Sequence, residues 1–386
     1  MLLIPPLLAF PALSAAVLVP GPTGPFAVAM KLQALTDTSR RDPLDPTGRS
    51  QNRRLLFSAF LPVDESCGAC PGTTLPYMTP SVAAWYGQQA AANGLPADLF
   101  SMFEMEVCDL DKLPARGREK GNEHEYPLVL FSPGFGDSRL MYGAMARSLA
   151  SQGYAVVTVD HPFDAMSVEF PDGTVIPGAN ISAEDPGAVK RVVQVRNDDL
   201  SFIIGQLLHN HTIRDPLLAN FRGSIALDKT VVIGHSLGGA AAAALARSDA
   251  RVLGGVDLDG QLADPAKSLG LAKPFLLAGR PGHSAEDATW DEFWPHLRGP
   301  RAELAVNGTT HGAFTDRPAL LSVFDIPGPV REALRAVLGS IEAKRLDVVL
   351  NGVLVRFFEL AMYGRDGPLR GVGWAFGEVS VTRSHL

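Results

Sequence analysis

The sequence predicts an α/β fold in which helices cover both faces of a mainly parallel sheet. Short continuous apolar runs alternate with longer helical segments from residue 126 onward, and such runs are typical of strands that are buried on both faces. Strands that alternate with helices along a chain favour a parallel sheet. The chain has 386 residues, of which 46% are hydrophobic and 19% are charged, so it can bury a large core.

The expected elements are taken in chain order. In the N-terminal third, strands are expected at 26–30 and 54–63, joined by a turn-rich link, and residues 80–107 are expected to be helical. The regular part is expected to contain strands at 126–132, 154–160, 229–236, 252–259, 274–279 and 302–308. The helices expected around them are 138–153, 187–208, 238–248 and 328–345.

The chain is expected to form one domain, because no internal repeat or low-complexity linker divides it. Within residues 21–386, the segment 80–112 is expected to be a lid-like insertion that caps a pocket, or else an ordinary part of the core. Residues 346–386 are expected to form a C-terminal extension. Its apolar stretch 346–363 contains charged residues and is therefore expected to be a packed helix and not a membrane anchor.

Residues 1–20 are interpreted as a secretory signal peptide, with a cleavage site among the small residues 14–16. The alternative is an apolar N-terminal arm that packs on the domain. Three N-x-[ST] sequons agree with export, and they begin at Asn180, Asn210 and Asn307. The alternative localisation is the peroxisome, because the C-terminal residues 384–386 are Ser-His-Leu, which is similar to the peroxisomal targeting signal Ser-Lys-Leu. Secretion is the favoured localisation.

The cysteines predict a disulfide and not a metal site. Cys67, Cys70 and Cys108 are too few for a zinc set, so an exported chain is expected to join Cys108 to Cys67 or Cys70. The pair His209 and His211 lacks a third ligand, and neither a metal nor a cofactor is expected. A formal net charge of −7 without a basic cluster argues against nucleic acid as a partner.

The stretch "VVIGHSLGG" at 231–239 contains the pattern G-x-S-x-G between an expected strand and an expected helix. In such a nucleophile elbow the serine occupies a strained turn, and glycines two residues away on each side allow a close approach. Ser236 is the predicted nucleophile, with Gly234 and Gly238 as the elbow glycines. The alternative is a glycine-rich phosphate-binding turn or a plain tight turn between a strand and a helix. No P-loop lysine and no G-x-G-x-x-G spacing are present, which argues against phosphate binding.

A serine hydroxyl needs a base to become a nucleophile, and histidine has a suitable pKa near pH 7. His311 is the predicted base because it directly follows the last expected parallel strand. His283 and His296 lie in a polar, tryptophan-rich connection and are expected to be surface or lid residues. His235 is expected to point away from the serine.

The predicted acid is Asp259, at the end of the strand that follows the elbow helix. Asp257 would lie deeper along the same strand, and Asp287 is the other plausible acid. The predicted oxyanion donors are the backbone N–H groups of Leu237 and Phe135. Gly134 and Gly136 would allow the loop that contains Phe135 to turn inward.

Together these residues resemble the platelet-activating factor acetylhydrolase family, in its plasma and fungal secreted branch. The matching parts are "PLVLFSPGFGDSRLMYGAMARSLASQGYAVVTVDHPFDA", "VVIGHSLGGAAA", "GGVDLDG" and "THGAF". The resemblance implies an α/β-hydrolase fold, a triad of Ser236, Asp259 and His311, and donors at Leu237 and Phe135. One departure is Pro133-Gly134, where the animal enzymes usually have His-Gly, and it bears on substrate preference.

The function that the resemblance implies is a calcium-independent esterase of lipids with short or oxidised acyl chains, working without a cofactor. Its partner would be an acyl-ester lipid, with peripheral contact at a lipid interface through the apolar 80–107 segment. A general carboxylesterase or polyester hydrolase would use the same residues. A non-catalytic binding protein on this fold is a minor alternative, because a full set of catalytic residue types is present.

Overall fold

A computed structural model describes residues 16–64, 70–113 and 124–386. The strands of its central sheet are β1 (Val17–Leu18), β2 (Ala27–Arg41), β3 (Asn52–Val63), β4 (Gly72–Pro76), β5 (Phe103–Cys108), β6 (His124–Ser132), β7 (Ala155–Asp160), β10 (Gly223–His235), β11 (Val252–Leu258), β12 (Phe275–Gly279), β13 (Arg301–Val306) and β14 (Val379–His385). They follow the order β1-β5-β2-β3-β7-β6-β10-β11-β12-β13-β14, with β4 paired to β5. A separate hairpin joins β8 (Ser167–Glu169) to β9 (Val175–Pro177).

The six central strands, from β7 to β13 in the sheet order, pair in parallel. Antiparallel strands flank them: β3 and β2 on one side and β14 on the other. The predicted mainly parallel sheet is therefore confirmed, and the antiparallel C-terminal edge strand is an addition. In a parallel sheet the carboxyl ends of the strands meet at one edge, which is where loops gather functional side chains.

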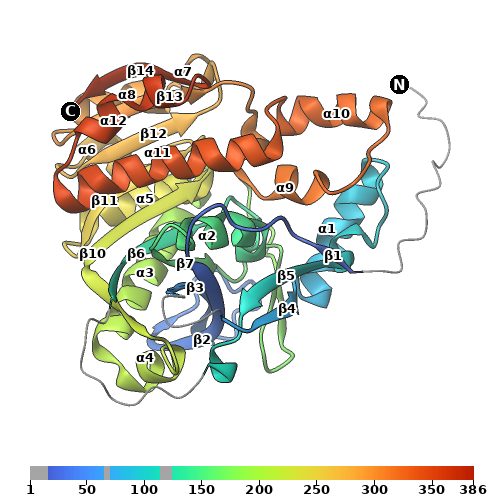
Figure 1. The fold of residues 1–386 in the computed structure, drawn as a ribbon. Helices are drawn as coiled ribbons and strands as arrows, with labels where there is room; N and C mark the ends of the chain where they lie inside the picture. The colour runs from blue at the N-terminus through green and yellow to red at the C-terminus, as the bar shows by residue number, and fades with distance from the viewer. Residues whose placement is uncertain (1–15, 65–69, 114–123) are drawn as a thin grey trace.

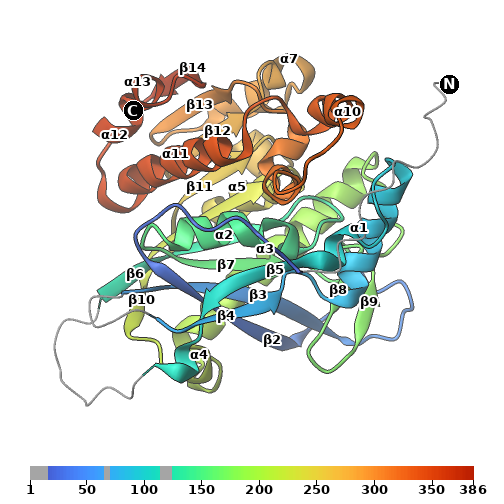
Figure 2. The same cartoon turned by 45° about the vertical axis from the view of Figure 1, so that its right-hand side comes forward.

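Helices cover both faces of the sheet (Figures 1 and 2). They are α1 (Pro80–Ala92), α2 (Gly143–Ala150), α3 (Pro186–His209), α4 (His211–Leu217), α5 (Leu237–Ser248), α6 (Ala266–Leu269), α7 (His283–Glu286), α8 (Thr289–Phe293), α9 (Arg317–Leu321), α10 (Gly328–Leu338), α11 (Ala343–Tyr363), α12 (Gly367–Arg370) and α13 (Val372–Ala375). Successive residues of β10 serve the two faces: Val231 and Ile233 join the core under α2 and α11, whereas Val232 joins the core under α3 and α5.

The N-terminal third differs most from expectation. The helix expected at 80–107 ends at Ala92, and residues 103–108 form β5. β2 continues to Arg41, so it takes in part of the expected link. The expected helix 328–345 is two helices, α10 and α11, because Gly339 adopts a φ of +84° that ends the first.

The N-terminal boundary expected at residue 20 falls inside the fold. β1 pairs with β5, Val19 is buried, and the Arg147 guanidinium donates to the carbonyl oxygens of Val19 and Pro20. Residues 1–15 lie outside the described residues. Cleavage after Ala16 would keep β1, whereas cleavage after residue 20 would remove it.

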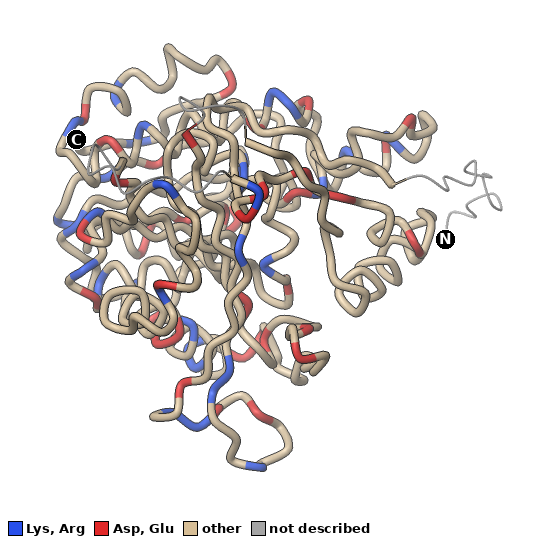
Figure 3. The backbone as a smooth tube through the Cα atoms, turned by 60° about the horizontal axis from the view of Figure 1, so that its bottom comes forward, with Lys and Arg blue, Asp and Glu red and all other residues tan. Residues whose placement is uncertain are grey.

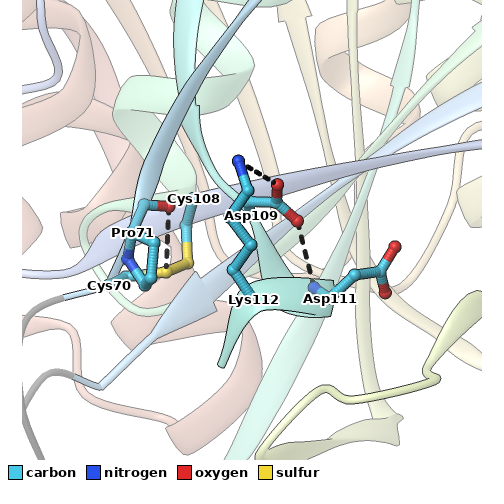
Figure 4. Close-up of a disulfide and its surroundings, with 6 residues drawn as sticks. All are labelled: Cys70, Pro71, Cys108, Asp109, Asp111 and Lys112. Atoms are coloured by element: carbon cyan, nitrogen blue, oxygen red, sulfur yellow. Dashed lines mark hydrogen bonds and ion pairs between the residues drawn. A yellow bond between two sulfur atoms is a disulfide. The ribbon is translucent and has the colours of Figure 1, made fainter. Parts of the chain in front are cut away.

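A disulfide joins Cys70 to Cys108, with 5.6 Å between the two Cα atoms (Figure 4). It ties the start of β4 to the end of β5. Of the two partners that the sequence left open for Cys108, the structure pairs it with Cys70, and Cys67 lies outside the described residues.

Candidate active site

The elbow at the end of β10 has the strained geometry that the glycine pattern predicts. Ser236 lies between β10 and α5 with φ 55° and ψ −127°, a region that is costly for a residue with a Cβ. A Cβ on Gly234 would lie 2.0 Å from the carbonyl oxygen of Gly238, and one on Gly238 would lie 2.0 Å from that of Ser132. Both positions therefore require glycine, and the turn presents Ser236 at the start of a helix.

His311 and Asp259 lie together at the same edge of the sheet. Asp259 directly follows β11, and its side chain is fully buried, while the His311 side chain is half exposed. The His311 Nδ1 is 2.7 Å from Asp259 Oδ2. Since Nδ1 is occupied by the carboxylate, Nε2 is the nitrogen left for chemistry. His311 and Ser236 both line one cleft, of about 1060 Å³.

His283 is the functional-site residue that sequence reasoning missed. It was expected on the surface or in a lid, but it is buried, and its Nδ1 lies 2.9 Å from Asp259 Oδ1. Its ring packs on Trp290, with 3.9 Å between the ring centroids. Burial lowers the pKa of His283, but the hydrogen bond to Asp259 and the nearby carboxylate of Asp287 outweigh burial and raise the pKa to about 9. His283 is therefore a cation at neutral pH.

Asp259 thus shares its two oxygens between two histidines. Arg280 adds two more donors, its backbone N–H at 2.8 Å from Oδ1 and its guanidinium at 2.6 Å from Oδ2. Burial alone would raise the pKa of Asp259, but these donors outweigh it and hold the pKa well below the usual range. Asp259 stays ionised and oriented.

The two other candidate acids do different things. Asp257 accepts from the Trp290 indole at 2.9 Å and from the Gly260 N–H at 2.9 Å, and burial raises its pKa well above the ordinary value. Asp287 lies 3.4 Å from His283 Nε2. Within the described residues, Asp259 is the carboxylate that contacts His311.

His235, next to the serine, is a buried structural residue. Its Nδ1 is 2.8 Å from the Tyr142 hydroxyl, and its Nε2 is 3.1 Å from the backbone oxygen of His311. Burial, reinforced by the nearby His311, lowers its pKa to about 3, so it remains neutral. A neutral His235 can donate from Nε2 to that oxygen and tether the loop of His311.

The two expected oxyanion donors also line the cleft beside Ser236. Leu237 is the first residue of α5, where backbone N–H groups have no partner within the helix. Phe135 lies in the turn after β6. Within the described part of the chain, neither the Leu237 N–H nor the Phe135 N–H meets a hydrogen-bond acceptor, so both are available to a ligand.

The walls of the cleft come from other segments than expected. They are built by residues 181–192, 261–267 and 280–289, and no residue of 80–112 contributes to the lining. Instead α1 packs behind the turn after β6, where the Tyr86 hydroxyl contacts Asp137 and Ser138. The segment 80–112 is therefore part of the sheet edge and its cover, and not a lid over the cleft.

Comparisons with known proteins show what the chain is similar to. A family model described as the alpha/beta hydrolase fold matches residues 127–319. A probable 1-alkyl-2-acetylglycerophosphocholine esterase of Arthroderma benhamiae is 30% identical over 94% of this chain and 93% of its own length. A platelet-activating factor acetylhydrolase of Cavia porcellus is 27% identical over 53% of this chain and 52% of its own.

Among solved structures, a ferulic acid esterase from Streptomyces cinnamoneus is similar to this chain. It aligns with a TM-score of 0.73 and 29% identity, covering 96% of this chain and 100% of its own. The sequence match over nearly the whole chain and the structural match therefore both indicate a relative of esterases with the α/β-hydrolase fold. The chain belongs to the platelet-activating factor acetylhydrolase family of α/β hydrolases.

Proposed function

We propose that this protein is a serine esterase that hydrolyses short-chain acyl esters of lipids, in the manner of a 1-alkyl-2-acetylglycerophosphocholine esterase. The match to the Arthroderma benhamiae esterase, which spans nearly the whole of both chains, carries the proposal. The contact between His311 and Asp259 beside Ser236 supports it at the level of chemistry.

In the proposed acylation step, Ser236 Oγ attacks the ester carbonyl carbon while His311 Nε2 takes the hydroxyl proton. Asp259 holds the imidazole through Nδ1 and stabilises its positive charge. The carbonyl oxygen becomes an oxyanion, which accepts from the N–H groups of Leu237 and Phe135. When the carbonyl re-forms, the ester C–O bond breaks, and the leaving alcohol takes the proton from His311.

Deacylation repeats these steps with water as the nucleophile. His311 accepts a proton from water, whose oxygen attacks the acyl-Ser236 carbonyl, and the oxyanion forms in the same place. Its collapse breaks the bond to Ser236 Oγ, which recovers the proton from His311, and the carboxylic acid leaves. All proton transfers in this cycle use one histidine, and no cofactor takes part.

A carboxylesterase of other substrates is the second candidate, because the structurally similar protein is a ferulic acid esterase. The cleft volume of about 1060 Å³ would also admit an acyl group larger than acetyl. The two candidates differ in the acid that is released and not in the catalytic residues.

The test is a panel of esters: p-nitrophenyl acetate, butyrate and palmitate, a 1-alkyl-2-acetyl glycerophospholipid and ethyl ferulate. The proposal expects the highest kcat/KM on the short-chain and sn-2-acetyl esters, and a loss of about 10⁴-fold or more in Ser236→Ala. A preference for palmitate or ferulate would favour the second candidate. Turnover that survives in Ser236→Ala would refute the assignment of Ser236 as the nucleophile.

We further propose that the protein is secreted. The disulfide between Cys70 and Cys108 supports this, since such bonds persist in oxidising compartments. Among the described helices, none is long and apolar enough to cross a membrane. Mass spectrometry of the exported chain tests the proposal, with a mature N-terminus at Val17 as the expected result.

A further inference from the structure

The turn after β6 leaves a single backbone donor for the cleft. Pro133 has no N–H, the Gly134 N–H donates to the Tyr142 hydroxyl at 3.0 Å, and the Gly136 N–H donates to Asp164 Oδ1 at 3.4 Å. Phe135, between them, lines the cleft. How well this N–H can stabilise an oxyanion depends on the direction of one peptide plane, the one that joins Gly134 to Phe135.

A buried arginine on α3 holds the opposite side of this turn. Arg196 donates from its guanidinium to the carbonyl oxygen of Pro133 at 2.5 Å and to that of Gly134 at 3.1 Å. Its side chain is 1% exposed, and its Nε lies 2.5 Å from Asp164 Oδ2. One guanidinium group thus donates to two successive carbonyl groups, while the Asp164 carboxylate balances its positive charge.

The Gly134 carbonyl and the Phe135 N–H belong to the same planar unit. In a trans peptide these two groups point in opposite directions, and the cis bond found among the described residues is elsewhere, at Asp264–Pro265. The Asp137 N–H reaches the same Gly134 oxygen at 3.2 Å, from within the turn. Arg196 and the Asp137 N–H thus hold the Gly134 oxygen on the side away from the cleft. The Phe135 N–H therefore points in the opposite direction, into the cleft.

We propose that Arg196 is the positioning residue of the oxyanion hole, holding the carbonyl groups of Pro133 and Gly134 so that the Phe135 N–H faces the developing oxyanion. The inference rests on the proposed esterase function. Arg196 contacts no substrate, and it acts through the peptide group between Gly134 and Phe135, to which it donates a hydrogen bond. A cation on the carbonyl oxygen also polarises that peptide and makes its N–H a stronger donor.

The test replaces Arg196 by lysine, which keeps the positive charge but cannot reach both carbonyl groups with one ammonium. We expect kcat for p-nitrophenyl butyrate to fall about tenfold to a thousandfold, the range for loss of an oxyanion donor, with KM changed less than threefold. Affinity for a trifluoromethyl ketone, which forms an oxyanion on Ser236, should fall by a similar factor. Affinity for butyrate, which forms none, should not change.

The matched control is Arg147→Lys. Arg147 is also buried and also donates to backbone carbonyl groups, those of Val19, Pro20 and Glu106, but it lies away from this turn. It should keep kcat and the ketone affinity. If Arg196→Lys does not fold, Asp164→Asn gives a second test, because it loosens the same guanidinium and should show a smaller loss with the same signature.

Retention of kcat and of ketone affinity within threefold in a folded Arg196→Lys or Asp164→Asn variant would overturn the inference. So would an equal loss in Arg147→Lys, which would indicate a general packing effect. The proposed function fails separately, by absence of Ser236-dependent turnover in the unchanged protein. An active parent with an unaffected Arg196 variant would refute this inference alone.

Discussion

At the scale of residues, the unusual feature of the site is a carboxylate shared by two histidines. Asp259 contacts His311 through one oxygen and the cationic His283 through the other. A positive charge on the far side of Asp259 weakens the field that would stabilise protonated His311. The charged groups around His283 are Asp259, Asp257, Arg280 and Asp287.

The first prediction concerns the pH–rate profile. Because the pKa of His283 is about 9, the cation beside Asp259 is lost as pH rises through this value, and Asp259 then stabilises the positive charge that develops on the His311 ring in the transition state more strongly. In the wild type, kcat/KM should therefore rise as pH passes 9. His283→Gln, which keeps an amide that can donate to Asp259, should lack this step. Stopped assays on p-nitrophenyl butyrate measure it, with His296→Gln, an exposed histidine, as control. A step of the same size in His283→Gln would contradict the argument.

A second prediction at this scale concerns stability. The folded-state pKa of His283 is about 9, above the unfolded value of about 6.5. Its ion pairs therefore stabilise the fold fully below pH 6.5, and this contribution is lost as pH rises through 9. Against His283→Gln, the wild-type advantage, on the order of 3 kcal/mol, should shrink across this window in urea titrations. An advantage that grows with pH would be evidence against a cationic His283.

At the scale of elements, the sequence predicted the parallel strands and the elbow well, because both are local patterns. The G-x-S-x-G pattern can be seen locally, although Gly238 is required by a contact with Ser132 at the end of β6. Continuous apolar runs between helices indicate buried strands. Residues 103–108 were missed because Phe103 and Met105, with Leu99 and Phe100 before them, also suit a helix. Only pairing with β2 and β4 decides for a strand. His283 was missed because its burial depends on Trp290 and Asp259.

The C-terminal strand supplies the prediction for this scale. Ser384 and His385 lie in β14, paired with Ala302 and Arg301, and the Leu386 oxygen accepts from Arg370. A receptor-read address must be free of the fold. A fluorescent protein fused to the N-terminus of residues 17–386 should therefore stay out of peroxisomes. The control, the same reporter ending in the last ten residues alone, shows whether the bare peptide is an address. Import of the full chain would contradict the pairing of β14.

At the scale of the whole molecule, the surface charge is mixed and one edge of the sheet carries a covalent tie. Acidic and basic residues are interspersed along the backbone (Figure 3), and the formal net charge is −7. The N-terminal edge of the sheet is made of short strands: β1 and β4 each pair with β5. Such short strands gain little from pairing alone, so a covalent tie at this edge has a clear physical use.

The last prediction tests that tie. The Cys70–Cys108 bond closes a loop with a sequence separation of 38, which removes chain entropy from the unfolded state worth about 4 kcal/mol. The double variant Cys70→Ala/Cys108→Ala should lower the free energy of unfolding by up to this amount, measured by guanidinium titration. Cys67→Ala, the partner that the sequence also allowed, should leave it unchanged. If Cys67→Ala lowered the free energy of unfolding instead, the bridge would involve Cys67. β4 would then be held to β5 by backbone pairing alone.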